Sequence, residues 1–391
     1  MSAASAVAEP ALRVISRPRD ELSDLDRSDL AQRRLPTRAE VRAVIPDHCF
    51  EVSTGRSLLH LALSLALTAV PVVLAARFLP LTWAWAPVWI LYALVTGTAG
   101  IGLWVLAHEC GHGAFSKNRW IQDGVGYVIH TAMLVPYYSW QRSHAVHHAK
   151  TNHLTQGETH VPRTTATRGY SSKVGFRQRL GRAPYALISI LKMLVLGWPA
   201  YLLFGTTGGP ERGRTNHFVP HGPFASDLFP ARWYRRVWAS AAGVLAVHVA
   251  LVAWAFSAGS IAPVIAFYVG PLLVVNAWLV AYTWLQHSDH DIPHFDHEDW
   301  SWLKGAFQTV DRPYGPVVDL LHHRIGSTHV AHHIDHRIPH YRADEATSAI
   351  AAAFPEWYRH DPTPVPKALW RVAGDCLAVE DGPDGWYYTM Q

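Results

Sequence analysis

The stretch LWVLAHECGHGAFS, residues 103–116, joins the end of a long apolar segment to two histidines, His108 and His112. These histidines are four residues apart, so a helix would place both imidazoles on one face. The apolar segment, Trp83 to Leu106, has the ~20 residues that are needed to cross the hydrocarbon core of a membrane. The sequence therefore predicts two imidazoles that can meet one metal ion at the end of a membrane span.

Two further groups, HAVHH at 144–148 and HVAHH at 329–333, share a second histidine spacing. On a helix, this i, i+3, i+4 spacing produces a ridge of imidazoles. The three groups hold eight imidazoles, more than the four ligands of a closed zinc site, which favours two metal ions. His287, at the end of the last apolar segment, is a ninth candidate. The predicted ligands are His108, His112, His144, His147, His148, His287, His329, His332 and His333.

Imidazole binds Zn, Cu, Fe and Ni, so the ligands alone do not identify the ion. A site beside apolar spans would meet hydrocarbon, and inert C–H bonds need a metal that changes oxidation state, which zinc cannot do. Iron with dioxygen is therefore the preferred chemistry. Recombinant protein could still contain zinc, because imidazole sites accept it readily.

Four apolar segments have the length of membrane spans: 58–79, 83–106, 237–256 and 261–285. Short turns join the first two and the last two, so each pair is predicted to form a hairpin. Arginine and lysine are concentrated outside the turns, where only Arg77 lies, so the positive-inside rule places the polar regions in the cytoplasm. Two further apolar segments, Val125 to Tyr138 and Tyr185 to Phe204, are short or interrupted by Lys192 and Pro199, and they are predicted to lie at the interface. The alternative for both is a buried helix of a soluble domain.

The predicted fold is an all-α integral membrane protein with four transmembrane helices in two hairpins and a cytosolic, histidine-rich helical cap that holds a dimetal site. Residues 1–45 would form a cytosolic N-terminal segment, disordered over 1–35, with a short helix beginning near Thr37 and ending near Pro46. Residues 46–345 would form the membrane domain and 346–391 a cytosolic C-terminal segment.

Composition excludes other classes of protein. A hydrophobic fraction of 49% fits membrane helices with a large polar region, and a net charge of +4 without an aromatic-interleaved basic patch argues against a nucleic-acid partner. Three cysteines are too few for a disulfide framework or a thiolate metal site. The 25 histidines are the feature that requires a chemical explanation.

Other polar residues have several possible roles. His60 and His248 occur singly within spans, where a structural role is expected. Nine further histidines could contact the ligands, lie at the interface or be exposed: His153, His160, His290, His294, His297, His322, His323, His336 and His340. Carboxylates that could orient ligating imidazoles are Glu109, Asp289, Asp291, Asp319 and Asp335.

The chain resembles the membrane fatty acid desaturases, in particular the delta-12 and omega-3 group. The similar segments include HECGHGAFS at 108–116, LVPYYSWQRSHAVHH at 134–148, TWLQHSDHDIPHF at 283–295 and THVAHHIDHRIPHYRADEAT at 328–347. The resemblance implies that the eight histidines of the three groups bind a di-iron pair, that His287 matches a further family histidine, and that O2 is a co-substrate. It also implies an acyl chain in a kinked tunnel and formation of a cis double bond, as in delta-12 desaturation of oleoyl to linoleoyl lipid.

The resemblance further implies two external electrons per turnover. The chain has no HPGG haem-binding motif, so a separate donor is expected, cytochrome b5 or ferredoxin depending on the host. The expected location is a multi-pass membrane protein with a cytoplasmic active site, in the endoplasmic reticulum of a eukaryote or the inner membrane of a bacterium.

Several alternatives stay open from the sequence. Gly113 stands where many plant members carry another histidine, which leaves the position of the reaction open. An omega-3 desaturase, or an acyl hydroxylase or acetylenase on the same scaffold, is the nearest alternative. A histidine-rich metal transporter or sensor is a remote one, because it should carry ionisable residues along its spans. The acyl carrier (phospholipid, coenzyme A or carrier protein) and the oligomeric state are open as well.

Overall fold

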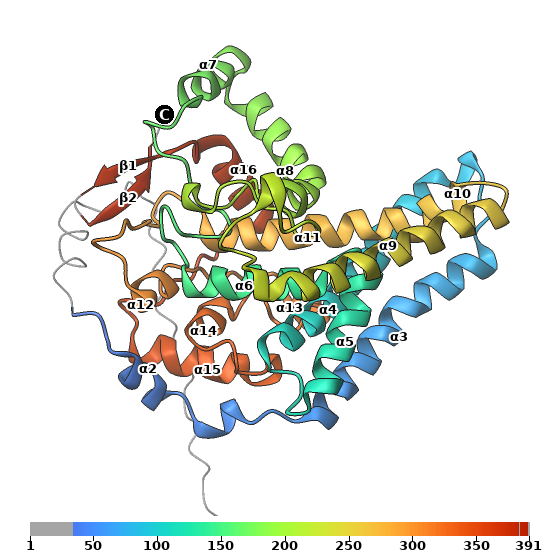
Figure 1. The fold of residues 1–391 in the computed structure, drawn as a ribbon, viewed down its shortest axis with the longest axis horizontal. Helices are drawn as coiled ribbons and strands as arrows, with labels where there is room; N and C mark the ends of the chain where they lie inside the picture. The colour runs from blue at the N-terminus through green and yellow to red at the C-terminus, as the bar shows by residue number, and fades with distance from the viewer. Residues whose placement is uncertain (1–33, 383, 390–391) are drawn as a thin grey trace, which may run out of the picture.

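The computed structural model describes residues 34–382 and 384–389, and this part of the chain is mostly helical (Figure 1). Five helical segments in it are long and apolar enough to cross a membrane: Thr54–Phe78, Trp83–His112, Arg182–Phe204, Ala231–Ser257 and Ala262–His287. Four of them correspond to the predicted spans. The fifth, Arg182–Phe204, covers the segment that was predicted to lie at the interface, so a four-span topology stays a prediction.

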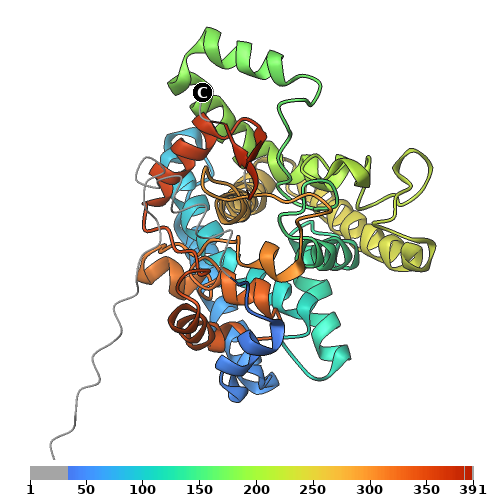
Figure 2. The ribbon, with the colours of Figure 1, turned by 90° about the vertical axis from the view of Figure 1, so that its left-hand side faces the viewer.

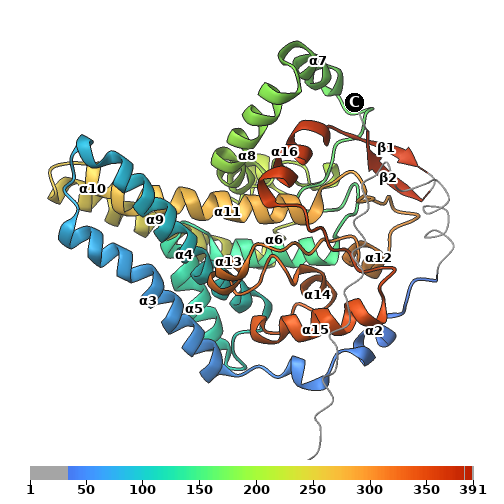
Figure 3. The same cartoon turned by 180° about the vertical axis from the view of Figure 1, so that it is seen from behind.

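The spans form the two expected hairpins. Helix α3 (Thr54–Phe78) leads through the turn η3 (Trp83–Trp85) into α4 (Ala86–His112), against which it packs. Helix α9 (Tyr234–Ser257) leads into α10 (Ala262–Val264), a π-helical turn η7 (Ile265–Val269) and α11 (Gly270–His287). In Figures 1 and 3, both hairpin turns lie at the same end of the molecule.

Helix α4 is the centre of the bundle. In its most apolar window 67% of the residues are buried, against 11% in α3 and in α9, whose apolar side chains face outward. Helices α4 and α11 approach closely at Gly97, where an added Cβ would lie 2.5 Å from the carbonyl oxygen of Pro271. Small residues allow such contact between membrane helices. The exposed apolar faces of α3 and α9 are suited to lipid.

Helix α4 continues beyond the predicted span and includes both His108 and His112. It ends at Gly113, whose φ of 84° is in the left-handed region that glycine adopts readily. The first histidine pair is therefore held by the last turn of the membrane helix itself.

The predicted interfacial helix at Val125 to Tyr138 is wrong in its bounds. The structure has α5 (Arg119–Ala132) and α6 (Tyr137–Ala149), separated by a break. Leu134 has a φ of 58° and Pro136 lacks a backbone N–H, so the helix cannot continue through this segment. The Asn118 side chain accepts hydrogen bonds from the backbone at the start of α5.

A polar layer of short helices covers the histidine ends of α4 and α11 (Figure 3). It contains α2 (Arg38–Val44), η2 (Asp47–Phe50), α12 (Trp302–Ala306), α13 (Pro316–Leu321), α14 (His329–Ile334) and α15 (His340–Ala353). The predicted short helix near Thr37 is confirmed, and Thr37 and Glu40 form a capping box at its start. Val41, Phe307, Val330 and Ile350 belong to one buried core that joins the two ends of this layer. The predicted disorder of residues 1–35 falls almost entirely outside the described residues.

Besides this polar layer, the described chain contains a further set of helices, turns and two strands. They are α7 (Tyr170–Leu180), α8 (Arg182–Phe204), the turns η4 (Pro210–Arg212), η5 (Gly222–Phe224) and η6 (Ala231–Trp233), α16 (Val365–Asp375), β1 (Val379–Gly382) and β2 (Gly385–Tyr388). The strands pair antiparallel, with Val379 opposite Tyr388, and lie near the C-terminus together with α16 (Figure 2). The all-α prediction is wrong in this detail, because the β-favouring sequence WYY follows a tight turn.

Candidate metal centre

The four segments that carry the predicted ligands meet in one place. Atoms of the first group, His108, His112, His144, His148 and His332, all lie within 4.8 Å of one another. The same limit holds for a second group of His147, His287 and His333. His329 adjoins the second group, because its Nε2 atom is 3.1 Å from that of His287. All nine predicted residues are thus in two adjacent groups, and their role as ligands stays a prediction.

The nitrogen separations fit those of atoms that share an ion. Nε2 of His108 is 2.9 Å from that of His144 and 3.2 Å from that of His112. Nε2 of His148 is 3.2 Å from that of His144. An ion with nitrogen ligands at ~2.0–2.1 Å holds two neighbouring ligand atoms about 3.0 Å apart at a right angle and about 3.4 Å apart at a tetrahedral angle. The first group therefore has the spacing of a coordination sphere.

Two buried Nε2 atoms of these groups lack a partner among the described residues. Nε2 of His332 and Nε2 of His333 are buried and have no hydrogen-bond partner. A buried polar atom without a partner costs free energy, and a metal bond would satisfy each of them. The donor set and these two atoms fit a pair of metal ions.

The imidazoles outside the membrane helices have the protonation state that ligands require. Burial, and to a smaller extent the neighbouring imidazoles of His160 and His108, lower the pKa of His147 to about 3. Burial and imidazole neighbours also hold the pKa values of His144, His148, His332 and His333 well below the usual range. Neutral imidazole is the metal-binding form, so these nitrogens are available at physiological pH.

One of the predicted supporting carboxylates lies beside a ligand. The Glu109 carboxylate is 3.7 Å from Nδ1 of His108 and accepts a hydrogen bond of 2.9 Å from the backbone N–H of His340. Thr151, which the sequence analysis missed, has its hydroxyl 3.0 Å from Nδ1 of His333. Such outer partners orient a ligating imidazole. Asp335, in contrast, is paired with Arg337.

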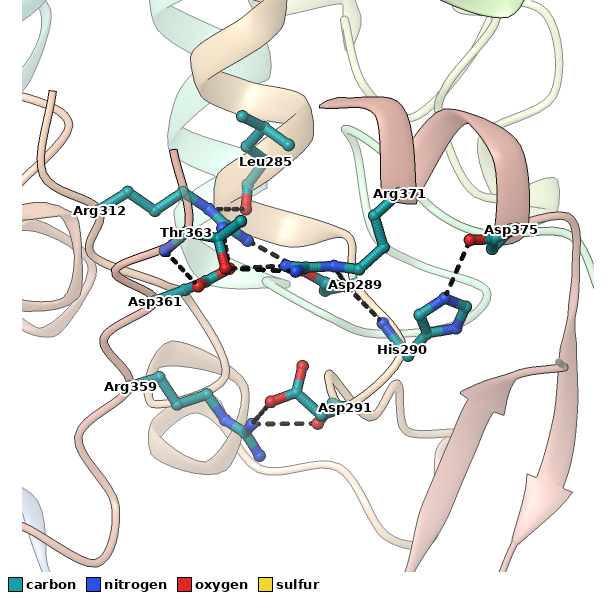
Figure 4. Close-up of polar contacts among 10 residues, drawn as sticks. All are labelled: Leu285, Asp289, His290, Asp291, Arg312, Arg359, Asp361, Thr363, Arg371 and Asp375. Carbon is teal, nitrogen blue, oxygen red and sulfur yellow. Dashed lines mark hydrogen bonds and ion pairs between the residues drawn. The ribbon is translucent and has the colours of Figure 1, made fainter. Parts of the chain in front are cut away.

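Asp289 and Asp291 belong to a charged network beyond the end of α11 (Figure 4). Arg312, which is fully buried, donates to the Leu285 carbonyl oxygen at 3.2 Å and to Asp289 at 3.0 Å, and it also pairs with Asp361. Arg371 pairs with the same two carboxylates. The network fixes the turn that follows His287, while Asp291 pairs separately with Arg359.

Two histidines to which the sequence assigned no single role, His336 and His160, lie close to the two groups of imidazoles. The ring of His336 is 4.7 Å from that of His112 and 5.2 Å from that of His148, between centroids. His336 follows His332 by four residues, the same spacing as between His108 and His112. This spacing is the sequence signal that could have pointed to His336. His160 lies beside the second group, where its Nε2 is 2.9 Å from the Thr283 hydroxyl. No sequence pattern pointed to His160.

An apolar pocket adjoins both groups, and His108, His144, His147 and His329 form part of its wall. Helices α4, α6, α8 and α11 supply most of the remaining wall. Its apolar side chains include Ile101, Trp104, Val105, Met193, Leu279 and Val280, and its polar ones include Thr159, His160, Thr283 and Gln286. The pocket thus brings hydrocarbon-compatible surface into direct contact with the candidate ligands.

Comparisons with known proteins agree with this architecture. Residues 83–363 match the family model described as fatty acid desaturase. The chain is 39% identical over 362 residues to a Delta(12)-acyl-lipid-desaturase of Punica granatum, with 90% of each chain covered. It is 40% identical to a Delta(12)-fatty-acid desaturase of Vernicia fordii, covering 90% of this chain and 91% of that one. It is also 39% identical to an oleoyl-12-hydroxylase of Ricinus communis, covering 88% and 87%. The chain belongs to the fatty acid desaturase family.

Proposed function

We propose that this membrane enzyme introduces a cis double bond at the delta-12 position of an oleoyl lipid, with two iron ions held by the nine histidines. The observation that carries the proposal is that two groups of converging imidazoles form part of the wall of an apolar pocket. The curated relatives support the position of the reaction, because several of them are named delta-12 desaturases.

The chain's own residues would bind and orient the substrate. When bound, the ions would supply the redox chemistry that an unactivated C–H bond requires. Trp104, Leu279 and Val280 would exclude water from the chain beside the ligands, because their side chains form the apolar wall. The first and second groups would each hold one ion.

We propose four spans and a cytoplasmic active site, with α8 lying along the membrane surface. At the start of α8, Arg182 pairs at 2.6 Å with Asp375, whose carboxylate is also 3.9 Å from the His290 ring, just beyond α11. At its end, the Tyr201 hydroxyl donates to Glu158 at 2.6 Å. The end of α8 thus contacts the segment that follows the second histidine pattern, and its start contacts α16, whose Asp375 lies near the segment after His287. In Figure 1, α8 also lies at a steep angle to α11.

Electrons would come from a separate protein, cytochrome b5 or ferredoxin. Arg38, Arg42 and Arg337 line a surface cavity with Asp335, next to His336. An acidic donor docked there would lie close to the first group of histidines. Complementary charge would steer such an encounter.

The test is to analyse total fatty acids by gas chromatography and mass spectrometry in a host that expresses the chain with competent electron donors. Cells are fed oleate or, separately, linoleate. New linoleate from oleate is the expected result. New alpha-linolenate from linoleate alone would replace the proposal with an omega-3 reaction.

A hydroxylase is the second candidate. The castor-bean relative is named an oleoyl-12-hydroxylase, and it is as similar to this chain as the desaturases are. In addition, His160 and Thr283 place polar atoms in the pocket wall beside the second group, where a product hydroxyl could form a hydrogen bond. A hydroxylated product in the feeding experiment would favour this candidate.

A further inference from the structure

We propose that His60, His323 and His340 form a third metal site, separate from the nine histidines, for a divalent ion that favours imidazole, such as Zn²⁺. The three residues come from α3, from the turn after α13 and from the start of α15. They are 263 and 17 residues apart along the chain, and they are brought together only by the fold.

The spacing of the three rings is like that within the two groups described above. One nitrogen from each ring lies within 4.8 Å of the other two. The ring centroids of His60 and His340 are 4.7 Å apart and those of His323 and His340 are 4.6 Å apart. Small side-chain rotations would bring three nitrogens to the separation of about 3.4 Å that a tetrahedral ion imposes.

One nitrogen in the trio has no partner in the part of the chain that the structure describes. Nε2 of His340 is buried and makes no hydrogen bond. Stacking on Tyr341 accounts for the place of His60, and a hydrogen bond to Ser64 accounts for that of His323, but neither contact satisfies His340. A metal bond at this atom would remove the cost of burying it unpaired.

The outer contacts of the rings suit ligands. Nε2 of His323 is 3.0 Å from the Ser64 hydroxyl, which leaves Nδ1 of that ring as the ligand atom. Nδ1 of His340 lies 3.7 Å from the Glu109 carboxylate, which leaves Nε2 as the ligand atom. Oxygen atoms behind the coordinating ring are typical of metal-bound histidine. The carboxylate of Glu109 would also offset part of the charge of the ion.

A fourth position is available for water. His323 and His340 line a small cavity together with Glu109, Thr328 and His332. Three imidazoles and a water are a common ligand set for Zn²⁺. The ion would also tie the membrane helix α3 to the polar layer, because His60 lies on α3 and the other two residues lie in that layer.

The test measures metal per chain rather than activity. Purified full-length protein in detergent is stripped of metal and saturated with Co²⁺ or, in a second experiment, with Zn²⁺. Unbound metal is removed on a desalting column, and bound metal is measured by inductively coupled plasma mass spectrometry. We expect about three ions per chain for the unchanged protein, and one fewer for His60→Gln and for His323→Gln. His248→Gln is the matched control, because it also removes a histidine from a membrane helix; its ring contacts the Val244 carbonyl oxygen.

Outcomes for this site and for the proposed function are distinguishable. His332→Ala should lose an ion from the first group and keep the third site, whereas His60→Gln should keep both ions of the two groups. Each variant must elute as a single folded species. Ser64→Ala gives a second measurement, because it removes only the outer contact of His323. We expect this variant to bind the ion of the third site about 10-fold more weakly, or weaker still. The same metal content in His60→Gln, His323→Gln and His248→Gln would overturn the third site.

Discussion

His332 and His333 are adjacent in the sequence but belong to different groups of imidazoles, and so do His148 and His147. Neighbouring residues on an α-helix point about 100° apart, because a turn takes ~3.6 residues. Each HxxHH pattern therefore supplies imidazoles to both groups from one short helix. This division explains why the second and third patterns have one more histidine than the first.

Removing one imidazole should open one metal position without disturbing the spans. We expect His147→Ala or His332→Ala to reduce iron per chain and to lower product formation more than about 100-fold, beyond the ~10–100-fold cost of losing an outer partner. Iron analysis and fatty acid analysis of the same membranes check this. His221→Ala, at an exposed position, is the control. Retained turnover in both variants would contradict the ligand assignment.

Glu158 gives the protein a pH dependence that does not involve the metals. The carboxyl group is buried, and burial raises its pKa to about 8. The folded state therefore keeps a proton that the unfolded chain has released above its ordinary pKa of 4.5. This group's contribution to stability is complete below pH 4.5 and is lost as the pH rises toward about 8.

Replacing Glu158 with glutamine should remove this loss. We expect the melting temperature of the unchanged protein to fall more between pH 6 and about 9 than that of Glu158→Gln, because the amide stays neutral. Fluorescence-detected unfolding in detergent measures the difference. Glu298→Gln, at an exposed site, should follow the unchanged protein. An equal slope for Glu158→Gln would show that Glu158 is charged in the folded protein.

The end of α11 is stabilised by charges as well as by the apolar packing of Leu285 against α16. Arg312 binds the Leu285 carbonyl oxygen, which the helix leaves without a partner, and it joins Asp289 to Asp361. His287 lies on this last turn, so the network determines where its ring lies. A helix end without such a partner would be free to fray.

Breaking this network should be costly. Arg312→Met leaves the two buried carboxylates with Arg371 as their one charged partner among the described residues, and we expect a loss of about 3–5 kcal/mol in the free energy of unfolding. Arg324→Met, which breaks an exposed pair with Asp344, should cost at most about 1 kcal/mol. Denaturant midpoints in detergent compare the two variants, and iron content reports whether His287 has moved. Equal midpoints would contradict the role of Arg312.

For the molecule as a whole, the sequence predicted what depends on local periodicity. Apolar length located the two hairpins, and histidine spacing identified eight of the nine residues that meet. The ninth, His287, was proposed from its place at the end of the last apolar segment. It could not reveal the trio of His60, His323 and His340, because those residues are far apart in the chain and occur singly. The pairing of Arg312 with Asp361 was equally inaccessible, since burial of an arginine follows from tertiary structure alone.

The position of α8 is the main topological question, because its composition allows a span while its contacts favour the surface. If both ends lie with the histidines, single cysteines before and after α8 should react with an impermeant maleimide from the same side. In a chain without its three native cysteines, Ala166→Cys and Ala225→Cys probe these ends, and Ala258→Cys probes the turn after α9; all three positions are exposed. We expect the first two to be labelled in inside-out vesicles and Ala258→Cys in intact cells. Opposite labelling of the first two would mean that α8 crosses the membrane, and the chain would then have five spans.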